Sequence, residues 1–175
     1  LKDNAYAYVE DSQIDSLGAD TLLVNNETIQ GLAVKSYLND EYDSIIINGS
    51  LGVSMAGVAG TVDVNNITNE SSAYITNSKI NTDTEQTAND NQNVDVYTEN
   101  KVLSEVYGGA LGVGGKAGVG ALSETAKITN TTYAGIKNNS IVNAKKDINV
   151  KTNSLEDYNS ILVAGGAAGS VGVAG

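Results

Sequence analysis

The residues that could perform chemistry begin with a glycine-rich stretch. Gly115-Lys116 has the glycine–lysine pair of a phosphate-binding loop, where backbone N–H groups and a lysine hold a nucleotide. However, Ala117 stands where that loop has the Ser or Thr that binds Mg²⁺, and Ala110 occupies its first glycine position. Gly112-Val113-Gly114 opens a dinucleotide-type pattern, but no helix is predicted after it. Nucleotide binding is therefore not expected, and these small residues are expected to allow close backbone approach.

Acidic residues are numerous but lack the spacing of a known site. A carboxylate pair could cleave glycosides, but no pair recurs at a defined spacing and the chain has neither Arg nor His. We therefore expect no enzymatic activity. Calcium could bind acidic turns such as residues 40–43 or Glu156-Asp157, because it prefers oxygen ligands. Neither follows a calcium-loop pattern, so no cofactor is expected and calcium is the one metal left open.

Charge and composition exclude several partners. The net charge is −11, and the 175 residues include no Cys, Pro, Trp, Phe or His. Such a charge disfavours nucleic acid, whose phosphates would repel it, and also anionic lipid. No apolar run is long enough to span a membrane, so membrane insertion is not expected. The absence of Cys fits a chain that stays extended during export.

The elements that must position these residues are sequence repeats. Gly57-Val58, Ile67-Thr68-Asn69 and Ile80 return at a constant offset of 61 as Gly118-Val119, Ile128-Thr129-Asn130 and Ile141 (118 − 57, 128 − 67, 141 − 80). A partial third copy is present, because residues 5–14 match residues 71–80. A second block recurs at an offset of 116, since residues 32–35 and 42–47 match 148–151 and 158–163. Fixed-period similarity predicts a repeat architecture.

The repeats suggest one continuous unit. We expect residues 1–175 to form a single segment of a longer array, with a partial repeat at 1–56 and further repeats at 57–117 and 118–175. Alternating apolar residues predict β-strands, with turns at Asn25-Asn26, Asn48-Gly49 and Asn65-Asn66. Asp15–Gln30 is a variable insert, and Asn81–Asn93 is an exposed loop that is longer than its counterpart Val142–Asp147.

The simplest fold for such a repeat is an all-β solenoid. Dividing the repeat unit into three gives coils of about 20 residues, a size typical of β-solenoids. Roughly nine such coils, each adding about 4.8 Å, would give a rod about 40 Å long. Val, Ile, Leu and Ala would face inward and stack on similar residues in the next coil. Asn69 and Asn130 occupy matching positions and would form an asparagine ladder.

The repeat motifs taken together resemble those of a known family. The glycine-rich run Leu111–Gly120, the Ile-Thr-Asn triplets and Ala73–Ile80 (Ala-Tyr-Ile-Thr-Asn-Ser-Lys-Ile) resemble passenger repeats of large bacterial surface adhesins and autotransporters, of the filamentous-haemagglutinin-like and leukotoxin-like kinds. The resemblance implies a right-handed parallel β-helix exported to the bacterial cell surface, acting as an adhesin or a filament in virulence. It identifies no individual functional residue. The Gly-Gly-x-Gly-x-Asp repeat of calcium-binding toxins is absent.

Three functions follow as expectations. The first is a non-enzymatic structural or adhesive segment of an extracellular protein, which associates with itself or with neighbouring rods. The second is a module that binds a host glycan or protein receptor through its variable loops. The third is a fragment of a secreted cytotoxin. The loop residues expected to contact a partner are Asp15, Asp20, Asn26, Asp83, Glu85 and Asp90.

Overall fold

The computed structural model is built from β-strands, two of them joined in a small hairpin. It describes residues 1–24, 26–83 and 86–175, and none of these residues is helical. Glycine and β-branched residues, which disfavour helix, recur along all the long strands. In chain order the strands are β1 (Lys2–Glu10), β2 (Gln13–Ile14), β3 (Leu22–Val24), β4 (Glu27–Ile29), β5 (Gly31–Gly52), β6 (Ala56–Thr76), β7 (Lys79–Ile80), β8 (Asn93–Gly114), β9 (Ala117–Lys137), β10 (Ile141–Val142), β11 (Ile148–Ala168) and β12 (Val171–Ala174).

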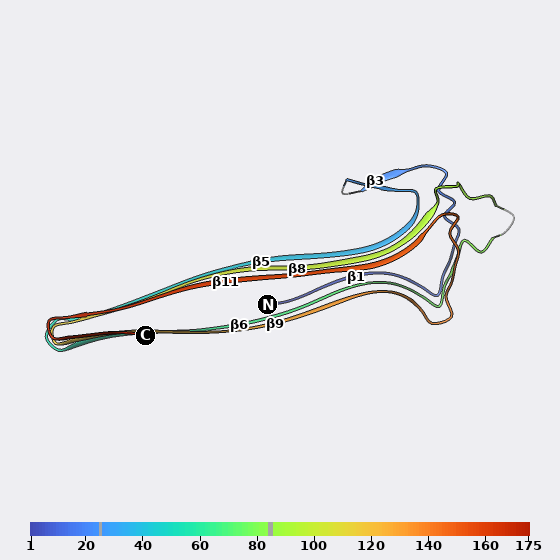
Figure 1. Ribbon diagram of the computed structural model, residues 1–175. Helices are drawn as coiled ribbons and strands as arrows, with labels where there is room; N and C mark the ends of the chain where they lie inside the picture. Colours follow the sequence, from blue (N-terminus) through green and yellow to red (C-terminus); the bar gives the residue numbers. More distant parts are fainter. Residues whose placement is uncertain (25, 84–85) are drawn as a thin grey trace.

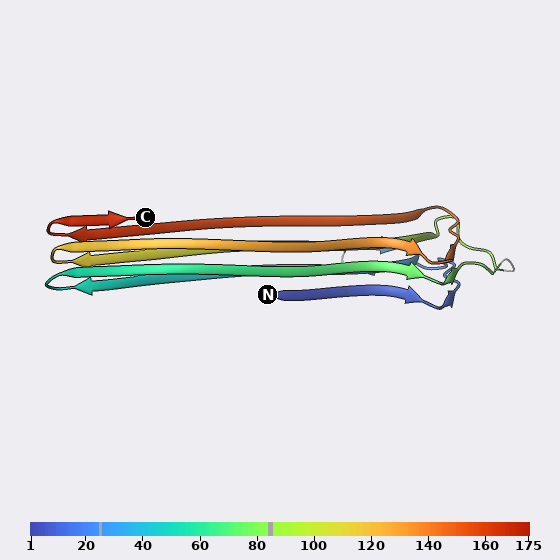
Figure 2. The same ribbon diagram turned by 90° about the horizontal axis from the view of Figure 1, so that it is seen from below.

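The long strands form two parallel sheets that lie against each other. One sheet has the order β1-β6-β9-β12 and the other β11-β8-β5, while β10-β7-β2 makes a short third sheet at one end. The chain runs along one long strand, turns at a narrow tip and returns along the opposite sheet (Figure 1). Seen at right angles, the successive passes lie side by side (Figure 2). The molecule is therefore an elongated two-layered wedge, wide at one end and thin at the other.

The pairing register confirms the sequence repeats. Gly57 pairs with Gly118, Ile67 with Ile128 and Asn69 with Asn130, each at the offset of 61. The opening copy pairs as predicted, since Ala5 lies beside Ser71 and Ile14 beside Ile80. The block with the offset of 116 also stacks, because Leu32 and Ile148 both pair with Val94 from opposite sides. Like residues therefore form columns across the parallel strands.

The predicted division of each repeat into three short coils is wrong. One complete pass runs from Leu32 to its partner Val94, an offset of 62 (94 − 32). Each pass contains two strands of 21 or 22 residues, and a strand of that length spans roughly 70 Å. The long axis thus runs along the strands, whereas the predicted nine-coil rod was elongated along the stack. The sheets are only three and four strands wide.

Two of the expected turns lie inside strands, which explains the error. Asn48-Gly49 belongs to β5, and Asn65-Asn66 belongs to β6. The Asn48 side chain donates to the backbone carbonyl of Gly60 across the sheets, and Asn65 accepts from the Tyr42 hydroxyl. These asparagines therefore bond from one sheet to the other and do not end strands. The acidic segments expected as turns, residues 40–43 and Glu156-Asp157, likewise lie in β5 and β11.

The interior changes character along the wedge. At the wide end, apolar residues such as Ile75, Ile80 and Val94 are fully buried. In the middle, buried hydroxyls meet between the sheets, where Ser71 lies 2.9 Å from Ser36 and 2.7 Å from Thr98. Toward the tip, glycine and alanine replace both kinds of residue. The space between the sheets narrows because these side chains are small.

The inserts predicted from sequence lie at the wide end. The insert 15–30 contains the hairpin β3–β4, and Asn26 lies at its turn with a φ of 63°. No strand is present in the described residues between Asn81 and Gln92, in agreement with the predicted loop. The shorter counterpart 143–147 is also a loop. Insert length therefore varies only where the chain passes around the wide end.

Candidate interaction surfaces

The predicted partner-binding residues lie in the wide-end loops without forming one cluster. The Asp83 backbone N–H donates to an Asp15 carboxylate oxygen over 3.3 Å. Asp90 is exposed, with one carboxylate oxygen 4.0 Å from the Lys145 ammonium. Asp20 is exposed beside the hairpin, and Asn26 lies within it. Glu85 falls outside the described residues.

The two variable loops are joined around a buried glutamine that sequence reasoning did not single out. Gln92 is fully buried, and its side-chain oxygen accepts from the Lys145 backbone N–H over 2.8 Å. The Asn89 backbone N–H donates to the Leu17 carbonyl over 2.9 Å, which links one insert to the other. A groove of about 290 Å³ lies beside Gln92, with Asn81, Asp83 and Lys145 among its lining residues. The loops thus present one joint surface.

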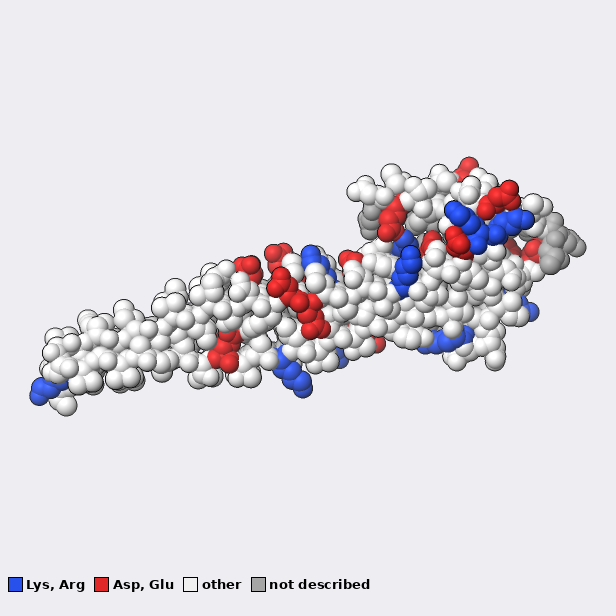
Figure 3. Space-filling model, viewed as in Figure 1, with Lys and Arg blue, Asp and Glu red and all other residues white. Residues whose placement is uncertain are grey.

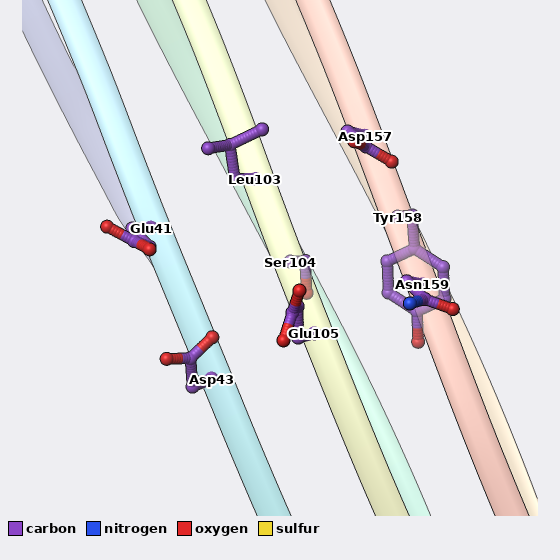
Figure 4. A pocket seen from close by; sticks show the side chains of 8 residues that line it. All are labelled: Glu41, Asp43, Leu103, Ser104, Glu105, Asp157, Tyr158 and Asn159. Carbon is purple, nitrogen blue, oxygen red and sulfur yellow. The ribbon is translucent and has the colours of Figure 1, made fainter.

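A second hollow lies on the outer face of the sheet β11-β8-β5. Its volume is about 400 Å³, and eight residues from three adjacent strands line it: Glu41, Asp43, Leu103, Ser104, Glu105, Asp157, Tyr158 and Asn159 (Figure 4). Asp43, Glu105 and Asn159 occupy one register row. No group of three or more acidic, histidine or cysteine side chains in the described chain is arranged to hold a metal ion. The hollow is therefore an acidic surface suited to cationic groups.

Hydrogen bonds on the same face perturb two titrating side chains. Burial, and then the hydrogen bond to Glu99, raise the pKa of Tyr97 to about 12. The Asn153 amide and the Tyr97 hydroxyl both donate to Glu99 and lower the pKa of that carboxyl. Between the sheets, burial raises the pKa of Asp40, and the nearby Asp3 carboxyl adds to the increase.

Tyrosines form a third surface, on the outer face of the sheet β1-β6-β9-β12. Tyr8 and Tyr74 stack with ring centroids 5.5 Å apart and an interplanar angle of 12°. The Lys137 ammonium lies 3.9 Å from the Tyr74 ring centroid. Tyr6 and Tyr133 are about half exposed nearby. Exposed aromatic rings of this kind can stack on sugars or on other flat ligands.

At the glycine-rich tip the two sheets approach each other unusually closely. Gly118 faces the opposite sheet so closely that an added Cβ would lie 2.2 Å from the Ala167 carbonyl oxygen. Gly115 and Lys116 form the turn between β8 and β9, and a strand begins at Ala117 where a phosphate-binding loop requires a helix. The glycines therefore serve sheet-to-sheet contact, as the sequence suggested.

Large aliphatic residues at the tip point outward, contrary to the prediction that they face inward. Ile47 is 82% exposed, Leu111 52% and Val163 65%, whereas Ala110, between these rows, is only 3% exposed. Most inward positions close to the tip turn belong to glycine and alanine, because the sheets there are too close for larger side chains. Charge is almost absent here: residues 44–62, 106–123 and 158–175 contain one charged residue, Lys116. The narrow end accordingly carries almost no coloured atoms (Figure 3).

The outward-facing apolar surface of the tip can be recognised from an alternation in the sequence. Between residues 106 and 120 the even positions are mostly glycine or alanine, and several odd positions are large and apolar. In a strand this alternation places the two sets on opposite faces. The small set marks the inner face wherever two sheets approach closely, so the apolar set must face out.

Comparison with known proteins gives no further assignment. No protein-family model matches the chain, and no curated protein or solved structure shows significant similarity. No helix among the described residues has the length and apolar character needed to cross a membrane.

Proposed function

We propose that this chain is a structural segment of an extracellular bacterial surface protein, in which each sequence repeat adds one layer to a right-handed parallel β-solenoid. One observation carries the proposal: the repeats pair in register along both long sheets, from Ala56–Ala117 to Thr76–Lys137 in one sheet and from Gly31–Asn93 to Gly52–Gly114 in the other. Parallel layers of this kind are the growth unit of repeat proteins, in which each repeat contacts mainly its neighbours.

Edge strands support the same proposal. β5 and β11 are the outer strands of their sheet, and an outer strand presents a row of backbone donors and acceptors to a further strand. A longer array would cover those groups with the next repeat. The absence of cysteine and the resemblance to surface-protein repeats support an extracellular location.

Insertion of one extra repeat tests the scaffold function. A second copy of residues 56–116, inserted after Lys116, should add one strand to each long sheet. Small-angle X-ray scattering should then show an unchanged longest dimension and a stack thicker by about 4.8 Å. The matched control carries the same inserted segment in scrambled order and should not join the stack. An increase in the longest dimension by the size of a separate domain would contradict the proposal.

A second candidate function is recognition of a host glycan, and the tyrosine surface favours it. Tyr8 is 57% exposed, and its ring lies parallel to Tyr74. In a glycan-binding assay with the whole chain, Tyr8→Ala should lower the affinity at least about tenfold, since a stacked ring contributes strongly to such contacts. Tyr37→Ala removes an exposed ring from the opposite outer face and should leave binding unchanged.

The loop groove offers the alternative route to a receptor. Gln86→Ala and Asp90→Ala change exposed residues of the longer loop without removing the buried Gln92. A receptor held by the loops would lose affinity with these variants and retain it with Tyr8→Ala. Unchanged binding with all three variants would remove both surfaces from consideration.

A further inference from the structure

The outer face of the sheet β11-β8-β5 has a regular relief at the tip. In one register row, Gly109 lies between Ile47 and Val163, which leaves a depression between two projecting side chains. Two residues further along, the order is reversed, because Leu111 projects between Gly49 and Gly165. A shallow groove of about 270 Å³ runs over Gly109.

We propose that this face binds a second copy of the same chain, with the two tips overlapping in opposite directions. A twofold axis across the strands at the level of Ala110 places the Gly109 row opposite the Leu111 row of the partner copy. Leu111 of one copy then enters the depression over Gly109 of the other. The same operation sets Ile47 against Gly49 and Val163 against Gly165, so all three strands are complementary in these two central rows.

Charge complementarity supports the antiparallel arrangement. One row before the apolar patch, toward the wide end, the outer face carries Asp43 and Glu105. The same symmetry brings this row over the partner's tip turn, which carries Lys116, the single charged residue of the tip. Each end of the overlap thus gains a carboxylate–ammonium pair. The acidic wide ends point away from each other, which limits repulsion between two chains of charge −11.

Lipid explains these features less well than a second copy does. A lipid-facing surface requires apolar character but no alternation of projections and depressions. Asp43 and Glu105 border the patch and disfavour anionic headgroups. A twofold contact is also self-limiting, because it uses the same patch on both copies and closes at the dimer.

The contact area sets the conditions of the test. Four register rows on three strands cover roughly 350 Å² on each copy, or about 700 Å² in total. Stable specific interfaces bury about 1,200–2,000 Å², so the dimer belongs to the weak class. Sedimentation should therefore be followed from roughly 10 µM to 1 mM, the range in which such contacts form.

Filling the depression should prevent the contact. A Cβ at Gly109 would lie 3.8 Å from the Ile47 side chain, an ordinary contact, so Gly109→Val should fold normally. It should raise the dimer dissociation constant at least about tenfold by excluding the second copy's Leu111. Gly60→Val is the matched control, because Gly60 lies on the other sheet with nothing within 4 Å of an added Cβ. Circular dichroism confirms that both variants fold.

A charge exchange tests the carboxylate–ammonium pairs at the two ends of the overlap. Lys116→Glu should weaken dimerisation several-fold at low salt, and adding Glu105→Lys should restore it, because the exchanged pair attracts again. The orientation is measured on Ser54→Cys, a site in the exposed tip turn of a chain with no native cysteine. Spin labels there should lie about 40 Å apart in the antiparallel overlap, since Ser54 is six residues beyond the axis in each copy.

Each result has a defined meaning. Dimers that are weakened by Gly109→Val but not by Gly60→Val, with labels about 40 Å apart, support the proposal. A chain that remains monomeric at about 1 mM overturns it. So does an oligomer that Gly109→Val leaves unchanged, which would indicate edge-to-edge stacking. Uptake by phosphatidylcholine vesicles in place of dimerisation would assign the face to lipid. The scaffold proposal is tested separately by repeat insertion, because it concerns strand edges and not this face.

Discussion

Close contact between the two sheets at the tip leads to a quantitative prediction for Gly118→Ala. The added methyl group would lie 2.2 Å from the Ala167 carbonyl oxygen and 2.6 Å from the Gly112 carbonyl oxygen. Both obstacles are backbone atoms of the opposite sheet, and neither can turn aside as a side chain would. The sheets would have to separate by roughly 1 Å at this point to restore normal contact distances.

The loss of stability in Gly118→Ala follows from overpacking of the space between the sheets. Added methyl groups in a packed interior destabilise by about 1–3 kcal/mol, and the rigid backbone places this site at the upper end. Gly60→Ala is the matched substitution in the same sheet, where an added Cβ meets nothing within 4 Å. It should stabilise by about 0.4–1 kcal/mol, because alanine restricts the unfolded chain more than glycine does.

Guanidinium denaturation followed by circular dichroism measures both effects. The two variants should differ by about 3–4 kcal/mol in the free energy of unfolding, with Gly118→Ala the less stable. The dependence of the free energy of unfolding on guanidinium concentration should be similar for the two variants if both unfold from the same structure. A midpoint of Gly118→Ala equal to that of the unmodified chain would refute the close approach of the sheets.

Two further predictions concern polar groups. The pKa of Tyr97 is raised from 10.0 to about 12; its contribution to stability is therefore complete below pH 10 and is lost between about pH 10 and 12. An absorbance titration near 295 nm should lose its highest tyrosine transition in Tyr97→Phe, and an unchanged titration would contradict the assignment. Ser71→Ala should destabilise by about 1–3 kcal/mol, because it removes a hydrogen-bond partner of the buried Thr98 hydroxyl and one of the two partners of the Ser36 hydroxyl. Ser54→Ala, in the exposed turn, should be neutral; equal midpoints for both serine variants would contradict this prediction.

Sequence reasoning placed the variable loops correctly but could not assemble a site from them. The length difference between Asn81–Asn93 and Val142–Asp147 located the loops, because insertions are tolerated outside a regular stack. It gave no reason to select Gln92, whose burial depends on contacts with Lys145 and with the earlier insert around Gly18. A glutamine in a polar loop has no sequence pattern that distinguishes a buried position from an exposed one.

The sequence by itself determined the register. Because Gly57, Ile67 and Asn69 recur at a constant offset, stacking each copy on the next is the arrangement that brings like side chains together, and the strands pair in this way. The length of a pass was decided only in three dimensions. Asn48 and Asn65 have the local character of turn residues, yet each finds a partner on the opposite sheet and the strand continues. Alternation in the sequence separates the small and the large tip residues onto two faces, but the short distance between the sheets decides that the glycines face inward and that Leu111 and Ile47 face outward.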